Sequence, residues 1–170
     1  MKLEIGSGGN PTPGYTHLDA NPEAKDVDIV AQADAIPLED ESVEELLAVN
    51  ILEHVEWYKV KDTLKEWARV VKNGGKIVIH VPDMMWLVKF LSDDNFDWQS
   101  YAGQQPFNAG TDKWEYFNHY VMSTDAPYNL HRSVYTYGFL TKLLEKFGFG
   151  NFQRRHAEAR WLYIEGTKLQ

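Results

Sequence analysis

The stretch that most constrains the fold lies at the start of the chain, where a short apolar run ends in a glycine-rich loop. The run Leu3-Glu4-Ile5 is followed by Gly6-Ser7-Gly8-Gly9-Asn10-Pro11. Glycine tolerates positive φ and lacks a Cβ, so backbone N–H groups in such a loop can turn inward and approach a ligand closely. In open α/β sheets, ligands bind at loops that follow the carboxyl ends of strands. The stretch therefore predicts a buried first strand followed by a ligand-binding loop.

Length and charge narrow the class of protein. A chain of 170 residues can bury roughly 70% of its unfolded surface, so we expect a single domain over residues 1–170. The net charge of −8 disfavours nucleic acid as a partner, because an acidic surface repels phosphates. The chain has no cysteine, which excludes disulfides and thiolate chemistry. Without a signal-peptide pattern or an apolar run near the roughly 20 residues of a membrane span, we expect a cytoplasmic protein with no membrane partner.

Short apolar runs alternate with helical periodicities along the chain. Strands are expected at residues 3–5, 15–18, 28–32, 46–50, 76–81, 152–156 and 161–168, and helices at 60–72, 84–91 and 137–147. A capped helical turn is expected at residues 42–45, and Asn73-Gly74 should end the first long helix. Strands alternating with helices favour a doubly wound, Rossmann-like, mostly parallel α/β sheet.

Two further features concern individual segments of this sheet. The β-branched run at 76–81 is typical of a strand covered on both faces. The last two strands are joined by too short a connection for a crossover helix, so they should pair antiparallel.

The alternation breaks at Ser92. Residues 93–133 hold nine of the chain's 23 aromatic residues without a sustained period. We interpret this segment as an aromatic-rich insertion folded over the carboxyl edge of the sheet.

Two ligand classes are disfavoured by spacing. A dinucleotide fingerprint requires G-x-G-x-x-G and an acidic residue about 20 positions later, whereas here Pro11 holds the sixth position and the first acid that ends a strand is Asp19. An NAD site is therefore not expected. His17-Leu18-Asp19 matches half of a metal-binding facial triad, but those sites lie in all-β barrels, so no metal is expected.

Four motifs, in order, resemble those of class I S-adenosylmethionine-dependent methyltransferases. Residues 4–8, Glu-Ile-Gly-Ser-Gly, are similar to the family's first motif, and Asp19 is similar to the acid that closes its second strand. Asp34-Ala35 resembles the adenine-side loop, and residues 50–55, Asn-Ile-Leu-Glu-His-Val, resemble the segment after strand four.

The resemblance covers most of residues 2–91, and residues 132–135 and 147–149 also resemble small single-domain members of the group. The two prolines between residues 10 and 14 exclude the helix that usually follows the glycine motif, so this connection is expected to be shortened.

The resemblance implies that the chain binds S-adenosyl-L-methionine. Asp19 would accept hydrogen bonds from the ribose hydroxyls, although it could instead cap the turn at Asn21-Pro22. Asp34 and the Ala35 N–H would contact adenine, Glu4 would lie near the methionine amino group, and the glycine loop would hold the carboxylate. The predicted cofactor-binding residues are Glu4, Gly6, Ser7, Gly8, Asp19, Asp34, Ala35, Asn50 and Leu52.

The predicted reaction is methyl transfer to an oxygen or nitrogen of a small-molecule or sugar-like acceptor. His54 follows the fourth strand and could act as a base near neutral pH, or it could simply shape the pocket. The predicted acceptor-binding residues are Trp57, Trp86, His119, His131 and Tyr135.

Three alternatives remain open at this stage. The shortened connection also suits a non-catalytic binding or regulatory protein of the same fold. A second copy or a partner could complete the site. A nucleotide-sugar or NAD enzyme is a further rival.

Overall fold

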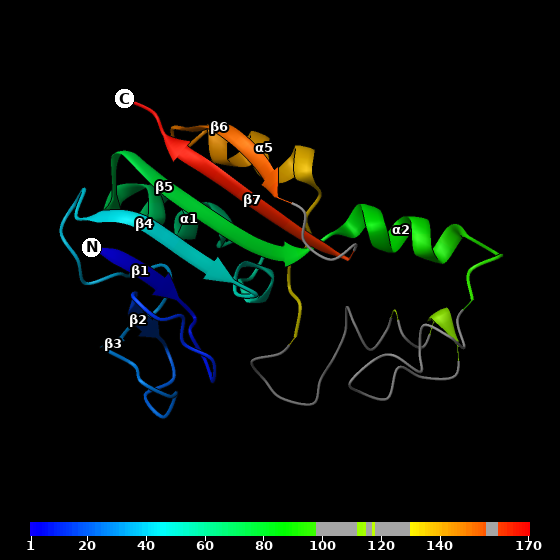
Figure 1. The fold of residues 1–170 in the computed structure, drawn as a ribbon, viewed down its shortest axis with the longest axis horizontal. Helices are drawn as coiled ribbons and strands as arrows, with labels where there is room; N and C mark the ends of the chain where they lie inside the picture. The colour runs from blue at the N-terminus through cyan, green and yellow to red at the C-terminus, as the bar shows by residue number, and fades with distance from the viewer. Residues whose placement is uncertain (98–111, 115–116, 118–129, 156–159) are drawn as a thin grey trace.

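A computed structural model describes residues 1–97, 112–114, 117, 130–155 and 160–170. The described residues form a seven-stranded sheet with the order β3-β2-β1-β4-β5-β7-β6 (Figure 1). Its strands are β1 (Lys2–Ile5), β2 (Thr16–Asp19), β3 (Ile29–Val30), β4 (Val43–Val49), β5 (Val71–Pro82), β6 (Phe149–Arg155) and β7 (Trp161–Lys168). The β1 to β5 pairings are parallel, and β7 runs antiparallel to both β5 and β6. This confirms the predicted α/β class and its antiparallel C-terminal pair.

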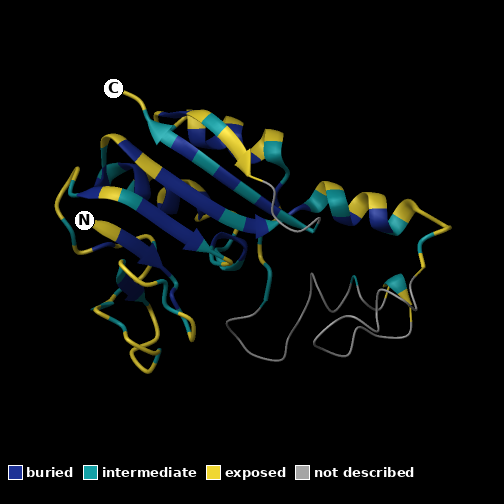
Figure 2. Cartoon of the chain, in the orientation of Figure 1, coloured by how far each residue is buried: buried dark blue, intermediate teal, exposed yellow. Residues whose placement is uncertain are grey.

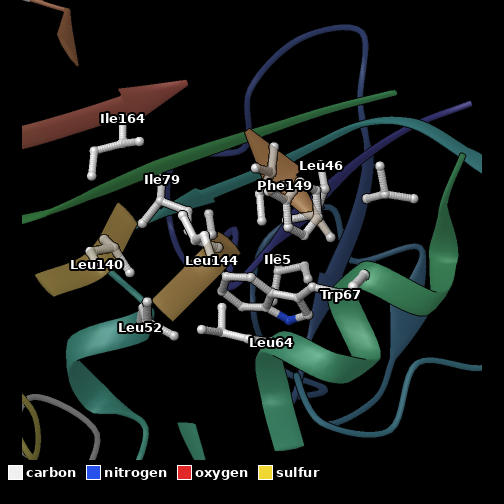
Figure 3. Packing of buried hydrophobic residues seen from close by; sticks show 14 of the residues in the cluster. Ile5, Leu46, Leu52, Leu64, Trp67, Ile79, Leu140, Leu144, Phe149 and Ile164 are labelled. Carbon is white, nitrogen blue, oxygen red and sulfur yellow. The ribbon is translucent and has the colours of Figure 1, made fainter. Parts of the chain in front are cut away.

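Helices α1 and α5 pack on one face of the sheet. The described helical segments are η1 (Leu52–His54), α1 (Val60–Val70), α2 (Met84–Ser92) and α5 (Tyr137–Glu145). Figure 3 shows Trp67 and Leu64 of α1 packed in one hydrophobic cluster with Ile5 and Leu46 of the sheet. Leu144 of α5 belongs to the same cluster. Both helices therefore cover the face that carries the odd positions of β1.

The opposite face of the sheet alternates polar and apolar side chains. Along β5, Lys76 is exposed, Val78 is buried and His80 is half-buried (Figure 2). Lys76 also pairs across the sheet with Glu165 at 2.9 Å. The expectation that this strand is covered on both faces therefore holds at Val78 and fails at Lys76, where β7 supplies a carboxylate instead of an apolar layer.

Strand pairing overrides two local predictions. The expected helical turn at residues 42–45 is wrong, because β4 already begins at Val43, which is buried and paired with Val71. The same pairing ends α1 earlier than expected. Val71 is extended at φ −74° and ψ 132°, and Gly74, with φ 77°, lies inside β5 rather than at the helix end.

The strand order places a ligand crevice at β1. In order along the sheet β1 lies between β2 and β4, so the chain winds in opposite directions on its two sides. Ligands of open α/β sheets bind outside the carboxyl ends of the strands at such a switch point. Within the described ranges, no helix is long and apolar enough to cross a membrane.

Helix α1 holds the loop that borders this crevice. Arg69 donates to both carboxylate oxygens of Glu66 at 2.8 Å and to Asp40 at 2.7 Å. The same guanidinium donates to the backbone carbonyls of Leu38 at 2.8 Å and Ile36 at 3.0 Å. One side chain on a helix therefore fixes the segment that follows the predicted adenine-side loop.

Replacing Arg69 with methionine should lower the free energy of unfolding by about 2 kcal/mol, because charge-assisted hydrogen bonds and backbone acceptors lose their partner. Chemical denaturation measures the difference. Lys65→Met, which removes an exposed cation from the same helix, is the matched control and should leave stability nearly unchanged.

The effect of Arg69 should depend on pH. The guanidinium beside Glu66 lowers the pKa of that carboxyl. A lowered folded-state pKa gives stability that is complete above the unfolded pKa of about 4.3 and is lost as pH falls through the folded value. The gap between wild type and Arg69→Met should therefore be constant near neutrality and narrow in acid. A gap that widens in acid would contradict this pairing.

Candidate functional site

An open cleft of about 1050 Å³ runs along the carboxyl ends of β1, β2 and β4. Its walls come from the glycine loop, the ends of β2 and β3, the segment after β4 and the start of α1. The described residues that line it include Gly6, Gly8, Gly9, Asp19, Asn21, Ala33, Asp34, Asn50, Ile51, His54, Glu56, Lys59, Thr63 and Arg132. Five of the predicted cofactor residues lie on this surface, and so does His54.

The glycine loop needs glycine for two separate reasons. Gly6 has φ 70° and its N–H donates to the carbonyl of Leu18 at 2.8 Å. A Cβ on Gly6 would lie 2.6 Å from the side chain of Ile51. The loop can therefore cross the end of β4 only as bare backbone.

Asp19 accepts a hydrogen bond from the glycine loop and also lines the cleft. Its Oδ2 accepts from the N–H of Gly8 at 2.9 Å, and its Oδ1 accepts from the N–H of Asn21 at 2.8 Å. Each carboxylate oxygen can accept more than one hydrogen bond, so lone pairs remain for a ligand in the cleft. The turn-capping role and the ribose-binding role are compatible at this residue.

Glu4 lies behind the loop instead of in the cleft lining. It is 3% exposed, and its two oxygens accept from the N–H and the hydroxyl of Thr12, both at 2.7 Å. His17 Nδ1 lies 3.8 Å from the same carboxylate. Glu4 thus ties down the loop, and its contact with a methionine tail stays a prediction. Ser7 is also buried and is absent from the lining.

The adenine-side loop is only partly arranged as expected. Asp34 is exposed and lines the cleft. The Ala35 N–H, in contrast, donates to the carbonyl of Gln32 at 3.1 Å and lies outside the lining. Trp67 holds this loop from α1, because its indole N–H donates to the carbonyl of Ala33 at 2.9 Å.

Asn50 and Leu52 play different parts at the end of β4. Asn50 lines the cleft with φ 52°, an unusual conformation that hydrogen bonds with His80 support: its N–H donates to the His80 carbonyl at 2.9 Å, and its Oδ1 lies 3.0 Å from His80 Nδ1. Leu52 is fully buried in the core. Its carbonyl accepts from the hydroxyl of Ser133 at 3.0 Å.

Three titratable side chains meet beyond Leu52. The ligand-capable atoms of Glu53, His54 and His131 all lie within 4.8 Å of one another. His54 Nδ1 donates to the carbonyl of Leu130 at 3.2 Å, which leaves Nε2 with a free lone pair. Burial lowers the pKa of His54. Burial, together with the neighbouring His54, also lowers the pKa of His131 to about 4. Burial raises the pKa of Glu53 to about 8.

Sequence reasoning assigned no role to Glu53, although it lies inside the motif segment 50–55. Its backbone carbonyl accepts from the N–H groups of Arg132 at 2.7 Å and Ser133 at 3.2 Å. These bonds join residues 130–133 to η1, so segments nearly 80 positions apart build the site. An acidic residue directly before the candidate base was the available signal.

The described members of the predicted acceptor set do not all lie in one place, although His131 and Tyr135 line the same small pocket. Trp57 is 74% exposed, and Trp86 stacks on Phe90 within α2 at 5.2 Å between centroids. Tyr135 is 1% exposed and belongs to the hydrophobic core. Of this group, only His131 reaches the cluster beside the cleft, and His119 lies outside the described residues.

Charged side chains outside the predicted set also line the cleft. Arg132 Nη1 donates to Glu56 Oε1 at 2.7 Å, and Lys59 lies on the same wall. The sequence prediction missed these residues because nothing in their spacing separates them from ordinary surface charges.

Comparisons with known proteins find methyltransferases. Residues 13–79 match the model of a family described as a methyltransferase domain. A search of curated proteins finds no match.

Solved structures extend the likeness to nearly the whole chain. A Thermotoga maritima S-adenosylmethionine-dependent methyltransferase, titled a possible histamine N-methyltransferase, is 20% identical with a TM-score of 0.64, over 98% of this chain and 81% of that one. A Methanosarcina mazei S-adenosylmethionine-dependent methyltransferase is 16% identical with a TM-score of 0.59, over 98% and 91%. A chain from the complex of the Haloferax volcanii Trm112 methyltransferase activator with a putative methyltransferase is 14% identical with a TM-score of 0.59, over 99% and 82%. At these identities the structures show the fold.

Substituting alanine at Gly6 should disrupt the loop. A non-glycine residue at positive φ costs about 1–2 kcal/mol, and the collision with Ile51 adds to that cost. We expect a lower free energy of unfolding in urea and loss of ligand binding in the cleft. Gly9→Ala is the matched control, because a Cβ there meets nothing within 4 Å. Equal stability of the two variants would contradict the role of Gly6.

Proposed function

We propose that the chain is a class I S-adenosylmethionine-dependent methyltransferase that methylates an oxygen or nitrogen of a small-molecule or sugar-like acceptor; the match of residues 13–79 to a methyltransferase domain and the fold shared with solved methyltransferases support this. The observation that supports this most is the layout of the cleft. Asp19, the glycine loop and His54, which follows β4, all line this one cleft. Such a layout can hold an adenosyl group and a reacting group side by side.

The residues of the cleft fit S-adenosylmethionine. A sulfonium-bound methyl group supplies the electrophilic carbon. Because a Cβ at Gly6 would collide with Ile51, the loop carries no side chain at this position. Asp19 is proposed to accept from the ribose hydroxyls with its remaining lone pairs, and Asp34 is proposed to accept from the adenine amino group. Asn50 would contact the ligand at the end of β4.

His54 is proposed to take a proton from the acceptor. The Leu130 carbonyl can only accept, so it fixes the hydrogen on Nδ1 and leaves Nε2 as the basic nitrogen. Methyl transfer depends mainly on positioning, with a base added when the acceptor must lose a proton. An imidazole whose Nδ1 bonds to a carbonyl and whose Nε2 can accept a proton meets that need.

Charges in the lining of the cleft support the proposed acceptor class. Arg132, Glu56 and Lys59 provide donors and acceptors of both signs, which suits hydroxyl- or amine-bearing molecules. The Thermotoga neighbour is titled a possible histamine N-methyltransferase, which supports nitrogen as one of the two acceptor atoms.

We also infer that a second copy or another protein covers part of the site. The cleft is open, and the connection between β1 and β2 is short. One structural neighbour is a chain from a complex with a methyltransferase activator. This inference concerns the affinity of the site, whereas the reaction type rests on the cleft itself.

Asp19→Ala should abolish cofactor binding. A ligand at 100 times its dissociation constant stabilises a protein by about 2.7 kcal/mol, so S-adenosylhomocysteine should raise the melting temperature of the wild type but not of this variant. Asp62→Ala, which changes an exposed residue at the start of α1, should keep the full shift. An equal shift in Asp19→Ala would contradict the ribose role. No shift in the wild type with either adenosyl ligand at millimolar concentration would support the non-catalytic alternative.

His54→Gln should reduce turnover while preserving cofactor binding. General bases typically contribute about 100-fold or more to the rate, so kcat should fall by at least that factor. The melting shift with S-adenosylhomocysteine should be unchanged. The acceptor for this assay comes from a screen of hydroxyl- and amine-bearing molecules scored by formation of S-adenosylhomocysteine. Full turnover in the variant would rule out the base role.

A further inference from the structure

The cluster beyond Leu52 has the composition of a metal site. We propose that Glu53, His54 and His131 together bind a divalent transition metal ion of the zinc class at the acceptor end of the cleft. Glu53 and His54 come from η1, and His131 comes from the segment that η1 holds through the Glu53 carbonyl. Two distant parts of the sequence thus bring one carboxylate and two imidazoles together.

A buried oxygen points to the ligand. Glu53 is 1% exposed, and its Oε2 has no hydrogen-bond partner among the described residues. A buried carboxyl oxygen without a partner costs free energy, and proteins normally pair such groups or use them to coordinate metals. The same carboxylate lies within 4.8 Å of ligand-capable nitrogens on both histidines.

The spacing and the donor atoms limit which metal fits. Bonds of about 2.0–2.2 Å to histidine nitrogen and carboxylate oxygen place such donors roughly 3–4 Å apart. Side-chain rotations that bring the three groups together by about an ångström would complete the set. Two imidazoles and a carboxylate favour Zn²⁺, Co²⁺ or Fe²⁺ over Mg²⁺ and Ca²⁺, which prefer oxygen ligands.

The surroundings allow a cation to enter and remain. His54 lines the large cleft, so the site has a route to solvent. The guanidinium of Arg132, a residue whose backbone N–H bonds to the Glu53 carbonyl, is paired with Glu56 at 2.7 Å. The hydroxyls of Ser133 and Tyr135, which also face η1, bond to each other at 2.8 Å and to the Leu52 carbonyl.

A metal here would deepen the proposed function. Three protein ligands leave coordination positions open toward the cleft, as in catalytic metal sites. An acceptor hydroxyl bound there would lose its proton more readily, so the metal would replace His54 Nε2 as the means of activation. This activating role of the metal rests on the proposed function, whereas metal binding itself follows from the cluster.

The test is direct titration of the full chain after treatment with a chelator. We expect one equivalent of Co²⁺ to bind and give a visible d–d absorption band, and one equivalent of Zn²⁺ to displace it in calorimetry. Outer-sphere changes at metal sites cost about 10–100-fold in affinity, so loss of a ligand in Glu53→Gln or His131→Gln should cost at least tenfold. Glu23→Gln, which removes a carboxylate elsewhere in the same cleft, should bind as the wild type does.

The outcomes separate this inference from the proposed function. Absence of Co²⁺ binding at millimolar concentration, or equal binding by both ligand variants, would overturn the metal site. A melting shift with S-adenosylhomocysteine in the metal-free protein tests the cofactor site independently. Glu53→Gln should melt at or above the wild-type temperature without metal, and it should lose the rise that Zn²⁺ causes in the wild type. If that variant fails to fold, His131→Gln gives the same test.

Discussion

The position of the glycine loop depends on the hydrogen bonds that hold the short connection between β1 and β2. Residues 6–15 contain no helix, so no helix N-terminus fixes the glycine loop. Two carboxylates take over that task. Glu4 binds Thr12 from behind, and Asp19 binds the Gly8 N–H from the side. All three hydrogen bonds have carboxylate acceptors, and bonds to charged acceptors are shorter and roughly twice as strong as neutral ones. Hydrogen bonds to two side chains therefore hold the loop, a task that a helix would otherwise perform.

The second border of the cleft depends on α1 in the same way. Trp67 and Arg69 lie in the last turn of that helix, and they bond to backbone carbonyls of the chain from Ala33 to Leu38. The helix thus packs its apolar stripe on the sheet and uses two polar groups to position the loop. Stability and ligand geometry are coupled here, since a change that loosens α1 also displaces the residues that face adenine in our proposal.

Local patterns in the sequence predicted most of the fold but only a minority of the residues that line the cleft. The helix near residues 60–70 and the closing pair β6 and β7 follow from periodicity and connection length. The strand at Val43 could not be predicted, because its cause is pairing with Val71, 28 positions away. Within the site, motif order identified Asp19 and Asn50, but spacing carries no information on which side of the loop a side chain lies. Glu4 was therefore expected in the cleft, whereas it is found behind it.

The buried polar atoms that lack a partner in the described part of the chain are Ser7 Oγ, His17 Nδ1 and Glu53 Oε2. Ser7 belongs to the glycine loop, His17 lies in β2, and Glu53 lies in η1. Folded proteins satisfy most buried polar groups, and the exceptions are expected at functional sites, where local rules are broken for a purpose. The glycine loop and η1 differ in this respect. Behind the loop, Glu4 lies 3.8 Å from His17 Nδ1, so that pair compensates itself in part. Among the described residues Glu53 Oε2 has no partner, and the cation that we propose beside it would supply one.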